Sequence, residues 1–385
     1  MQYSEQKPRA DGAIQVGPIH TLTYRLYGSA DVWERNNSVV YLHGGPGAGS
    51  APYFHRFFDP AFFNVIVHEQ RGAPEAKPWG IIEDNSPDEL IEDCEALRRH
   101  LGIEKWHVFG GSWGSTLALL YAEKYPTRVC SLTLRGVFLM RDEEIEWFLA
   151  GMGRFFPEAW DEFANYVGKT TSSDILESYF RQLMSPDPDK HDRAARAWVR
   201  YENGCSFRTP LPDAERTDPM KDALCMARVE AHFFLNHKMR NRILDEISSI
   251  RHIPTMIVQG RYDVVCPPKT AFDLRRELHN CCLQLVETGH SAKEPEIMKC
   301  LIAAADRIVA STSEVQAGVP VFPMTFPASS APKDGRSFRG LFKSNNPPRN
   351  DVLSVRYDIA SDWWVDLLGI PIQRHSSLEH WGPDQ

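Results

Sequence analysis

One short stretch of this 385-residue chain has the residue types that covalent catalysis needs: GGSWG, at positions 110–114. It joins an apolar run at 106–112, which predicts a strand, to a helix-like run at 115–126. A serine on so tight a strand-to-helix turn projects its oxygen above the sheet edge, at a helix N-terminus that favours developing negative charge. We therefore predict that Ser112 is a nucleophile. The alternative is a serine that only caps the helix.

A serine hydroxyl is a poor nucleophile without a base, and the base needs an acid to orient it. After a turn of this kind the three groups follow in the order Ser, acid, His. Asp263 comes directly after a predicted strand at 254–261, and His290 comes directly after one at 282–288. Loops at such strand ends gather at one site, so we predict Asp263 as the acid and His290 as the base. The alternatives are a turn or cap aspartate and a surface-loop histidine.

Acyl transfer also needs backbone N–H groups that point at the carbonyl oxygen of the substrate. We expect one of them from Trp113, the residue that follows the serine. The second is expected from HGGPG at residues 43–47, directly after the apolar run at 38–42. Glycines there let the backbone approach a substrate closely, although the same residues also suit an ordinary tight turn.

These groups require a sheet whose strands end at a common edge. Short runs rich in β-branched residues predict strands at 20–29, 38–45, 63–70, 106–112, 129–137, 254–263 and 282–289. The stretches between them predict helices at 86–102, 115–126, 267–278 and 294–310. This alternation predicts the α/β class, with a mostly parallel sheet covered by helices on both faces.

The pattern changes between about residues 140 and 252, where strand-like runs vanish and helical, aromatic-rich stretches take over. We interpret 140–252 as a helical cap inserted between two parts of the core, at 1–139 and 253–310. Residues 311–385 begin with a stretch rich in Pro, Ser, Asn and Gly, which is typical of a linker, and continue as a C-terminal extension.

The composition disfavours several classes of protein. Lys plus Arg is 43 and Asp plus Glu is 51, and this net charge of −8 gives no reason to bind nucleic acid or anionic membranes. The eight cysteines have no CxxC spacing, the start is polar, and no uncharged run reaches about 18 residues. We therefore expect a cytoplasmic protein without a membrane span. HEQRG at 68–72 lacks the second histidine of HExxH, so we expect neither metal nor cofactor.

The chain resembles the proline iminopeptidases, or prolyl aminopeptidases, over about residues 20–310. The resemblance is carried by HGGPGAG (43–49), EQRG (69–72), GGSWGSTLAL (110–119), LRGVFLMR (134–141), GRYDVVCP (260–267) and GHS (289–291). That family consists of serine peptidases with an α/β-hydrolase fold and a helical cap. The resemblance thus implies the same fold, the triad Ser112, Asp263 and His290, and oxyanion donors at Gly45 and Trp113.

The resemblance also implies how a substrate is bound. In the family, acidic cap residues bind the free α-ammonium, and the matching segments AWVRYE and ARVEAHFF supply Glu202 and Glu230. A cation in a partly dry pocket needs such carboxylates. Phe138 matches a position near the apolar pocket for the proline ring. The alternatives are solvated helix faces for the glutamates and core packing for Phe138.

Two features depart from the family. Its DQRG-x-G-x-S loop is EQRGAPEAKPWG here, at 69–80, and the tail at 311–385 exceeds the usual family length. The first hypothesis is therefore a peptidase that releases an N-terminal residue, preferably proline, from small peptides or amides. The second is an ester, lactone or amide hydrolase of a specialised small-molecule pathway with the same triad. The third, a catalytically silent interaction protein, is disfavoured by the complete triad. The tail is a candidate for assembling a homo-oligomer.

Overall fold

The computed structural model describes residues 2–29, 37–209, 212 and 218–316, and the backbone of three short strands near the C-terminus. The chain forms two compact units, Met1–Met324 and Thr325–Gln385. In the second unit, β9 (Tyr357–Asp358), β10 (Trp363–Val365) and β11 (Pro371–Ile372) pair antiparallel. The helix that precedes the predicted linker extends to Gln316, so residues 311–316 are helical rather than linker. The rest of the predicted linker and the assembly role of the tail fall outside the described residues.

The first unit is built on an eight-stranded sheet with the order β1-β2-β4-β3-β5-β6-β7-β8. Its strands are β1 (Ala10–Val16), β2 (His20–Tyr27), β3 (Ser38–Leu42), β4 (Asn64–His68), β5 (Trp106–Gly111), β6 (Val129–Arg135), β7 (Thr255–Gly260) and β8 (Cys281–Val286). The pairs β1–β2 and β2–β4 are antiparallel, and all later pairs are parallel. The predicted α/β class with a mostly parallel sheet is confirmed.

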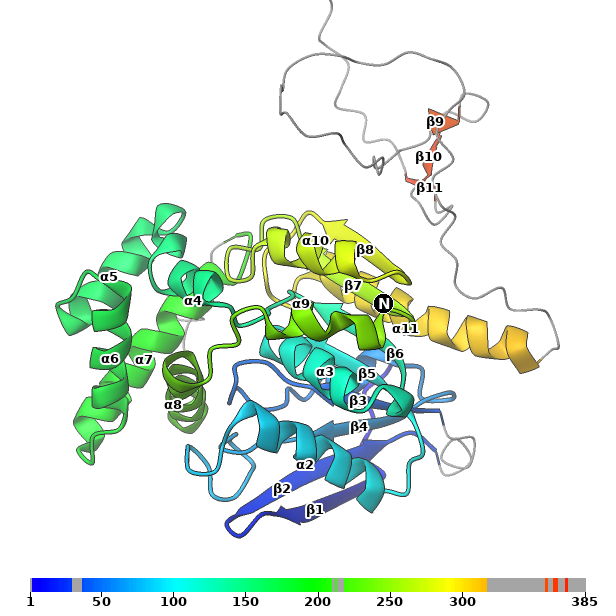
Figure 1. Ribbon diagram of the computed structural model, residues 1–385, viewed down its shortest axis with the longest axis horizontal. Coiled ribbons are helices and arrows are strands. Elements are labelled where there is room, and N and C mark those ends of the chain that lie inside the picture. Colours follow the sequence, from blue (N-terminus) through cyan, green and yellow to red (C-terminus); the bar gives the residue numbers. More distant parts are fainter. Residues whose placement is uncertain are drawn as a thin grey trace, which may run out of the picture. The chain divides into compact units, whose positions relative to one another are not determined.

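Helices cover both faces of this sheet (Figure 1). Strand β3 shows why both faces are apolar: Val40 and Leu42 belong to one buried cluster, and Val39 and Tyr41 belong to another. Alternate residues of a strand point to opposite faces, so each face needs its own helical cover. The first cluster contains residues of α2 (Pro87–His100), α3 (Trp113–Lys124) and α10 (Pro268–Glu277). The second contains residues of α11 (Pro295–Gln316) and the short turn η1 (Phe54–Phe57).

The helix α2 begins where its sequence signals predict. Ser86 is the N-cap and accepts a hydrogen bond from the backbone N–H of Glu89, while its hydroxyl donates to the Glu89 side chain. The first of these bonds satisfies one of the N–H groups that the first helical turn leaves without a partner.

Most of the chain between β6 and β7 forms a separate group of helices, which we call the cap (Figure 1). Its elements are α4 (Asp142–Leu149), η3 (Gly151–Arg154), α5 (Pro157–Val167), α6 (Ser172–Leu183), α7 (Pro188–Cys205) and α8 (Met220–Asn236). The last two elements before β7, α9 (Arg242–Glu246) and η5 (Ile247–Ile250), pack instead against α3 over the sheet (Figure 1). Stacked rings fill the centre of the cap: Phe163 lies 4.5 Å from Tyr179 and 4.3 Å from Tyr201, centroid to centroid. This aromatic centre fixes α5, α6 and α7 against one another.

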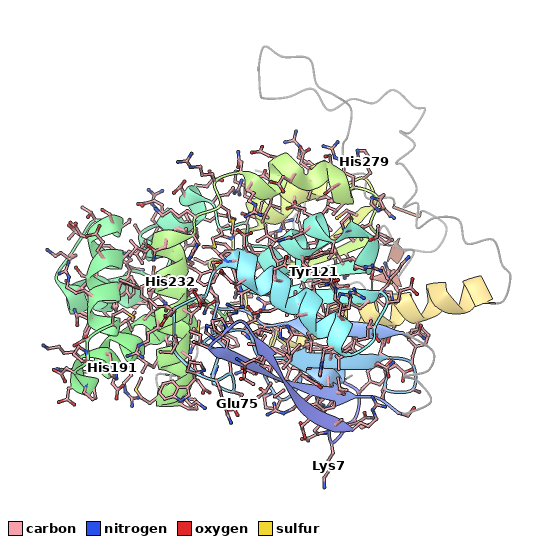
Figure 2. The ribbon with its side chains drawn as sticks, turned by 60° about the horizontal axis from the view of Figure 1, so that its bottom comes forward. Lys7, Glu75, Tyr121, His191, His232 and His279 are labelled. Carbon is pink, nitrogen blue, oxygen red and sulfur yellow. The ribbon has the colours of Figure 1, made fainter. Side chains whose placement is uncertain are left out.

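Figure 2 shows the same division with side chains drawn. The labelled His191 and His232 belong to the cap helices α7 and α8, whereas Tyr121 lies on α3, over the sheet. No helix in the described part of the chain combines the length and the apolar character needed to cross a membrane.

Candidate active site

Ser112 lies at a sharp turn between β5 and α3. Its backbone has φ 57° and ψ −126°, a conformation that non-glycine residues rarely adopt. Neighbouring backbones leave no room for larger residues: a Cβ on Gly114 would lie 2.1 Å from the carbonyl oxygen of Leu42. Ser112 occupies the N-cap position of α3, yet its side chain makes no capping hydrogen bond. The hydroxyl is therefore not used as a cap.

The two other predicted triad residues are in contact. Asp263 Oδ2 and His290 Nδ1 are 2.8 Å apart, and both side chains are buried. The backbone N–H of Cys266 and the amide Nε2 of Gln259 donate to Asp263 at 2.8 and 3.1 Å, which fixes the carboxylate. Because an ionised carboxylate only accepts, Nδ1 of His290 carries the proton and Nε2 has the free electron pair.

Arg135, at the end of β6, contacts the free nitrogen of this histidine. Its Nη1 donates to His290 Nε2 at 3.0 Å and to the carbonyl oxygen of His290 at 3.1 Å. Arg135 also lies against the serine turn, because a Cβ on Gly111 would be 2.5 Å from its Nη2. In the described part of the chain, no hydrogen bond joins the Ser112 hydroxyl to His290. In this arrangement Arg135, rather than the Ser112 hydroxyl, occupies the free nitrogen of His290.

The glycine loop at 43–47 lies beside Ser112. A Cβ on Gly44 would be 3.9 Å from the serine Oγ. Gly45 has φ +106°, and a Cβ there would lie 2.7 Å from two backbone nitrogens, so this turn requires glycine. The two predicted oxyanion donors therefore belong to segments that lie at Ser112. Trp113 follows the serine in the chain, and Gly45 belongs to the glycine loop beside it.

Gln70, which sequence analysis did not single out, holds these segments together. Its backbone N–H donates to His43 Nε2 at 3.0 Å, and its side-chain amide donates to the His43 carbonyl at 2.9 Å. The Trp113 indole N–H donates to Gln70 Oε1 at 2.8 Å. Burial lowers the pKa of His43, which keeps that ring neutral as an acceptor. The only sequence signal was its place in the EQRG segment.

The altered residue Glu69 holds the other end of the glycine loop. Its Oε1 accepts the backbone N–H of Ser50 at 2.9 Å and also the Ser50 hydroxyl. The rest of the loop at 69–80 packs on α8, since a Cβ on Gly72 would lie 2.9 Å from a methyl carbon of Val229. The altered segment at 69–80 therefore contacts both the glycine loop and the cap helix α8.

Glu202 on α7 and Glu230 on α8 form a buried carboxyl pair, 7% and 3% exposed. The two carboxyl groups lie close enough for each to shift the pKa of the other, and the Trp198 indole donates to Glu230 Oε2 at 2.6 Å. Burial raises the pKa of Glu202 to about 7, and burial together with the Glu202 charge raises the pKa of Glu230 well above its usual range. The pair therefore holds a proton near neutral pH.

One oxygen of this pair stands out because it lacks a partner in the described part of the chain. Glu202 Oε2 is buried and makes no hydrogen bond within the described residues. Burial raises the Glu202 pKa and the positive charge of Arg135 opposes that effect, so Glu202 lies within electrostatic reach of the residue that contacts His290. A buried carboxylate oxygen without a donor is costly unless a ligand supplies one.

Phe138 follows β6 and is 7% exposed. Its backbone is fixed by the first turn of α3: the Ser115 hydroxyl accepts its N–H at 3.1 Å, and the Thr116 hydroxyl donates to its carbonyl at 2.7 Å. Its ring lies 6.0 Å from that of Phe234 on α8, centroid to centroid. Phe138 therefore packs where the core meets the cap.

The histidine of the HEQRG segment, His68, is buried, and burial lowers its pKa to about 4, so its imidazole is neutral. Within the ranges that the structure describes, no group of three or more His, Cys, Asp or Glu side chains is arranged to hold a metal ion.

Comparisons with known proteins agree with this architecture. Residues 37–296 match the model of the alpha/beta hydrolase fold family. A proline iminopeptidase of Arabidopsis thaliana is 40% identical over 315 residues, which cover 80% of this chain and 82% of that protein. A proline iminopeptidase of Neisseria meningitidis is 37% identical over 312 residues, covering 80% of this chain and 98% of that protein.

Solved structures share the fold at low sequence identity. VinJ matches with a TM-score of 0.56 at 18% identity, over 79% of this chain and 99% of that chain. The proline iminopeptidase of Mycobacterium smegmatis matches with a TM-score of 0.53 at 14% identity, over 80% and 100%. On the family model and the curated relatives together, this chain belongs to the proline iminopeptidases of the α/β-hydrolase fold.

Proposed function

We propose that this protein is a serine peptidase that releases an N-terminal residue, preferably proline, from small peptides or amides. The observation that carries the proposal is the buried carboxyl pair of Glu202 and Glu230, in which Glu202 Oε2 has no partner among the residues that the structure describes. A substrate's free α-ammonium group would supply the missing donor and positive charge. The names of the curated relatives support the same activity.

Ser112 acts as the nucleophile in this proposal. Once Arg135 has withdrawn, His290 Nε2 takes the hydroxyl proton as the serine oxygen forms a bond to the substrate carbonyl carbon. Asp263 keeps the imidazole in the required tautomer and stabilises its positive charge. Backbone N–H groups of Gly45 and Trp113 donate to the oxyanion. His290 then protonates the leaving amine as the amide bond breaks, and water hydrolyses the acyl-enzyme with His290 as base.

Substrate selection is assigned to the cap. Glu202 and Glu230 receive the α-ammonium, so a blocked amine would leave Glu202 Oε2 unpartnered. Phe138 offers an apolar ring at the junction of core and cap, which suits the pyrrolidine ring of proline. The cap also limits the size of the substrate, because its helices lie beside the edge of the sheet at which β5, β7 and β8 end, just before Ser112, Asp263 and His290 (Figure 1).

We also propose that the protein works in the cytoplasm. Eight cysteines are too sparse in 385 residues for a disulfide scaffold, and five of them are buried, which fits a reducing cytoplasm. A small peptide is the partner that the site suits.

Three substrates test the proposal: a prolyl-arylamide, its N-acetylated form and a short-chain aryl ester. We expect fast hydrolysis of the first and loss of activity on the second. Cleavage of the ester with no cleavage of either arylamide would instead support the specialised ester or lactone hydrolase, for which the altered loop at 69–80 beside α8 is the argument. Ser112→Ala is the control for contaminating activity.

A further inference from the structure

The C-terminal end of α7 is joined to the loop that carries His290. The backbone carbonyl of Ser206, the residue directly after α7, accepts two hydrogen bonds from this loop. The N–H of His290 donates at 2.8 Å and the N–H of Ser291 at 2.9 Å. A backbone oxygen of the cap thus holds the main chain of the histidine itself.

Glu294 closes this junction from the other side. Its Oε1 accepts the backbone N–H of Gly289 at 2.7 Å and that of Arg208 at 3.3 Å. Gly289 precedes the histidine, and Arg208 belongs to the cap segment that follows α7. One carboxylate oxygen therefore bridges the cap and the histidine loop, in a position where both donors are backbone groups.

The junction is tightly packed. A Cβ on Gly289 would lie 2.6 Å from the backbone nitrogen of Arg208 and 2.9 Å from Glu294 Oε1. The Arg208 side chain adds two contacts, because its Nη1 donates to the carbonyl of Glu287 at 2.8 Å and its guanidinium carbon lies 4.9 Å from the ring centre of Tyr262. Tyr262 directly precedes Asp263, so these contacts reach the acid as well as the base.

The same cap segment carries one half of the carboxyl pair. Glu202 lies in the last turn of α7, and the Ser206 hydroxyl donates to its backbone carbonyl at 2.8 Å. Residues 202–208 therefore run from the amine-binding carboxyl pair to the histidine loop as one continuous, hydrogen-bonded stretch.

We propose that Glu294 is a positioning residue: it fixes the His290 loop to the end of α7, so that the base and the amine-binding Glu202 are set by one rigid segment. The part concerning Glu202 rests on the proposed peptidase function. The part concerning His290 holds for any substrate that the triad hydrolyses.

Glu294→Ala tests the proposal, with the prolyl-arylamide and the aryl ester measured side by side. Loss of the bridge lets the imidazole shift, and misplacement by about 1 Å costs up to about 100-fold in rate. We expect kcat to fall about 10- to 100-fold on both substrates, with a smaller change in KM. Glu294→Gln keeps an acceptor oxygen at the same reach and should restore most of kcat.

Glu294 lies directly before α11, so its loss could also lower activity simply by destabilising that helix. A carboxylate there also stabilises the helix through its dipole, and the exposed Glu296, in the first turn, is a matched control for that effect. Rates are expressed per active site, counted by complete fluorophosphonate labelling, and the melting temperature is measured for each variant. An unchanged kcat per site in Glu294→Ala, or equal losses in Glu296→Ala, overturns the proposal.

If Glu294→Ala does not fold, the shorter carboxylate of Glu294→Asp replaces it. We expect a folded protein whose kcat falls on both substrates and whose rate of fluorophosphonate labelling falls in parallel. Normal labelling and kcat in that variant contradict the positioning role. Hydrolysis of the ester by the wild-type protein without hydrolysis of the prolyl-arylamide would contradict the proposed peptidase function. The effect of the Glu294 variants on the ester rates would still test the positioning role.

Discussion

The core and the cap contribute to this site in different ways. On the core, Ser112, Asp263 and His290 stand at the ends of parallel strands, where backbone hydrogen bonds fix each turn. On the cap, Glu202 and Glu230 lie inside helices, and the packing of α7 against α8 brings them together. We propose a division of labour in which the core performs the chemistry and the cap selects a free amine.

The largest effect should come from the core nucleophile. Ser112→Ala removes the oxygen that forms the acyl-enzyme, and loss of a triad member costs about 10⁴- to 10⁶-fold in kcat. Both the prolyl-arylamide and the aryl ester should be affected. Steady-state rates measure this, and substantial ester turnover by the variant would show that the core does not perform the chemistry as described.

Gly45→Ala should have the second-largest effect on kcat. The positive φ and the 2.7 Å approach of two backbone nitrogens force the loop to rearrange, which displaces an oxyanion donor. Loss of one such donor costs about 10²- to 10³-fold in kcat, again on both substrates. A loss confined to amine-bearing substrates would assign this loop to recognition rather than to the oxyanion.

A moderate effect should appear in the pH dependence of amine binding. The raised pKa of Glu202, about 7, means that its carboxyl is ionised above that pH and neutral below it. The KM of the prolyl-arylamide should therefore rise as pH falls, by about tenfold between about pH 8 and pH 6. The KM of the ester is the control, since it needs no ammonium site. Parallel pH profiles of the two KM values would contradict the role of the cap.

The smallest effect concerns stability. Because the folded protein raises the pKa of both glutamates, it holds their protons more tightly than the unfolded chain does, and the pair destabilises the fold as pH rises above about 4.5. Glu230→Gln removes this cost and can keep an acceptor for the Trp198 indole. We expect the melting temperature to rise by about 2–4 °C at about pH 8 and to change little at about pH 4. Destabilisation at both pH values would argue against a buried like-charge pair.

The sequence predicts the core better than it predicts the contacts between distant elements. Short β-branched runs and the GGSWG turn identify the strands and the serine turn, because sheet formation and tight turns depend on local residue types. The exposed edge strand β1 was not predicted: its residues ADGAIQV are mostly solvent-accessible and weak strand formers. It forms because β2 offers a pairing partner.

Arg135, Gln70 and Glu294 were not predicted as parts of the site. Each reaches it through a side chain or loop whose partner lies 5 to 155 residues away, such as Arg135 with His290 or Glu294 with Gly289. Residue type and spacing do not specify such pairs, since the approach depends on how the strands and the cap pack. The carboxyl pair was expected only from the family resemblance, for the same reason.

The most direct test of the division between core and cap is the preference for a free amine, measured as the ratio of kcat/KM for the prolyl-arylamide to that for its N-acetylated form. The wild-type protein should show a high ratio, and Glu202→Gln should lower it by about 10- to 100-fold, the worth of a hydrogen bond to a charged group. Hydrolysis of the aryl ester should stay within about twofold of the wild-type rate. Equal losses on the arylamide and the ester, or an unchanged ratio, would contradict the account.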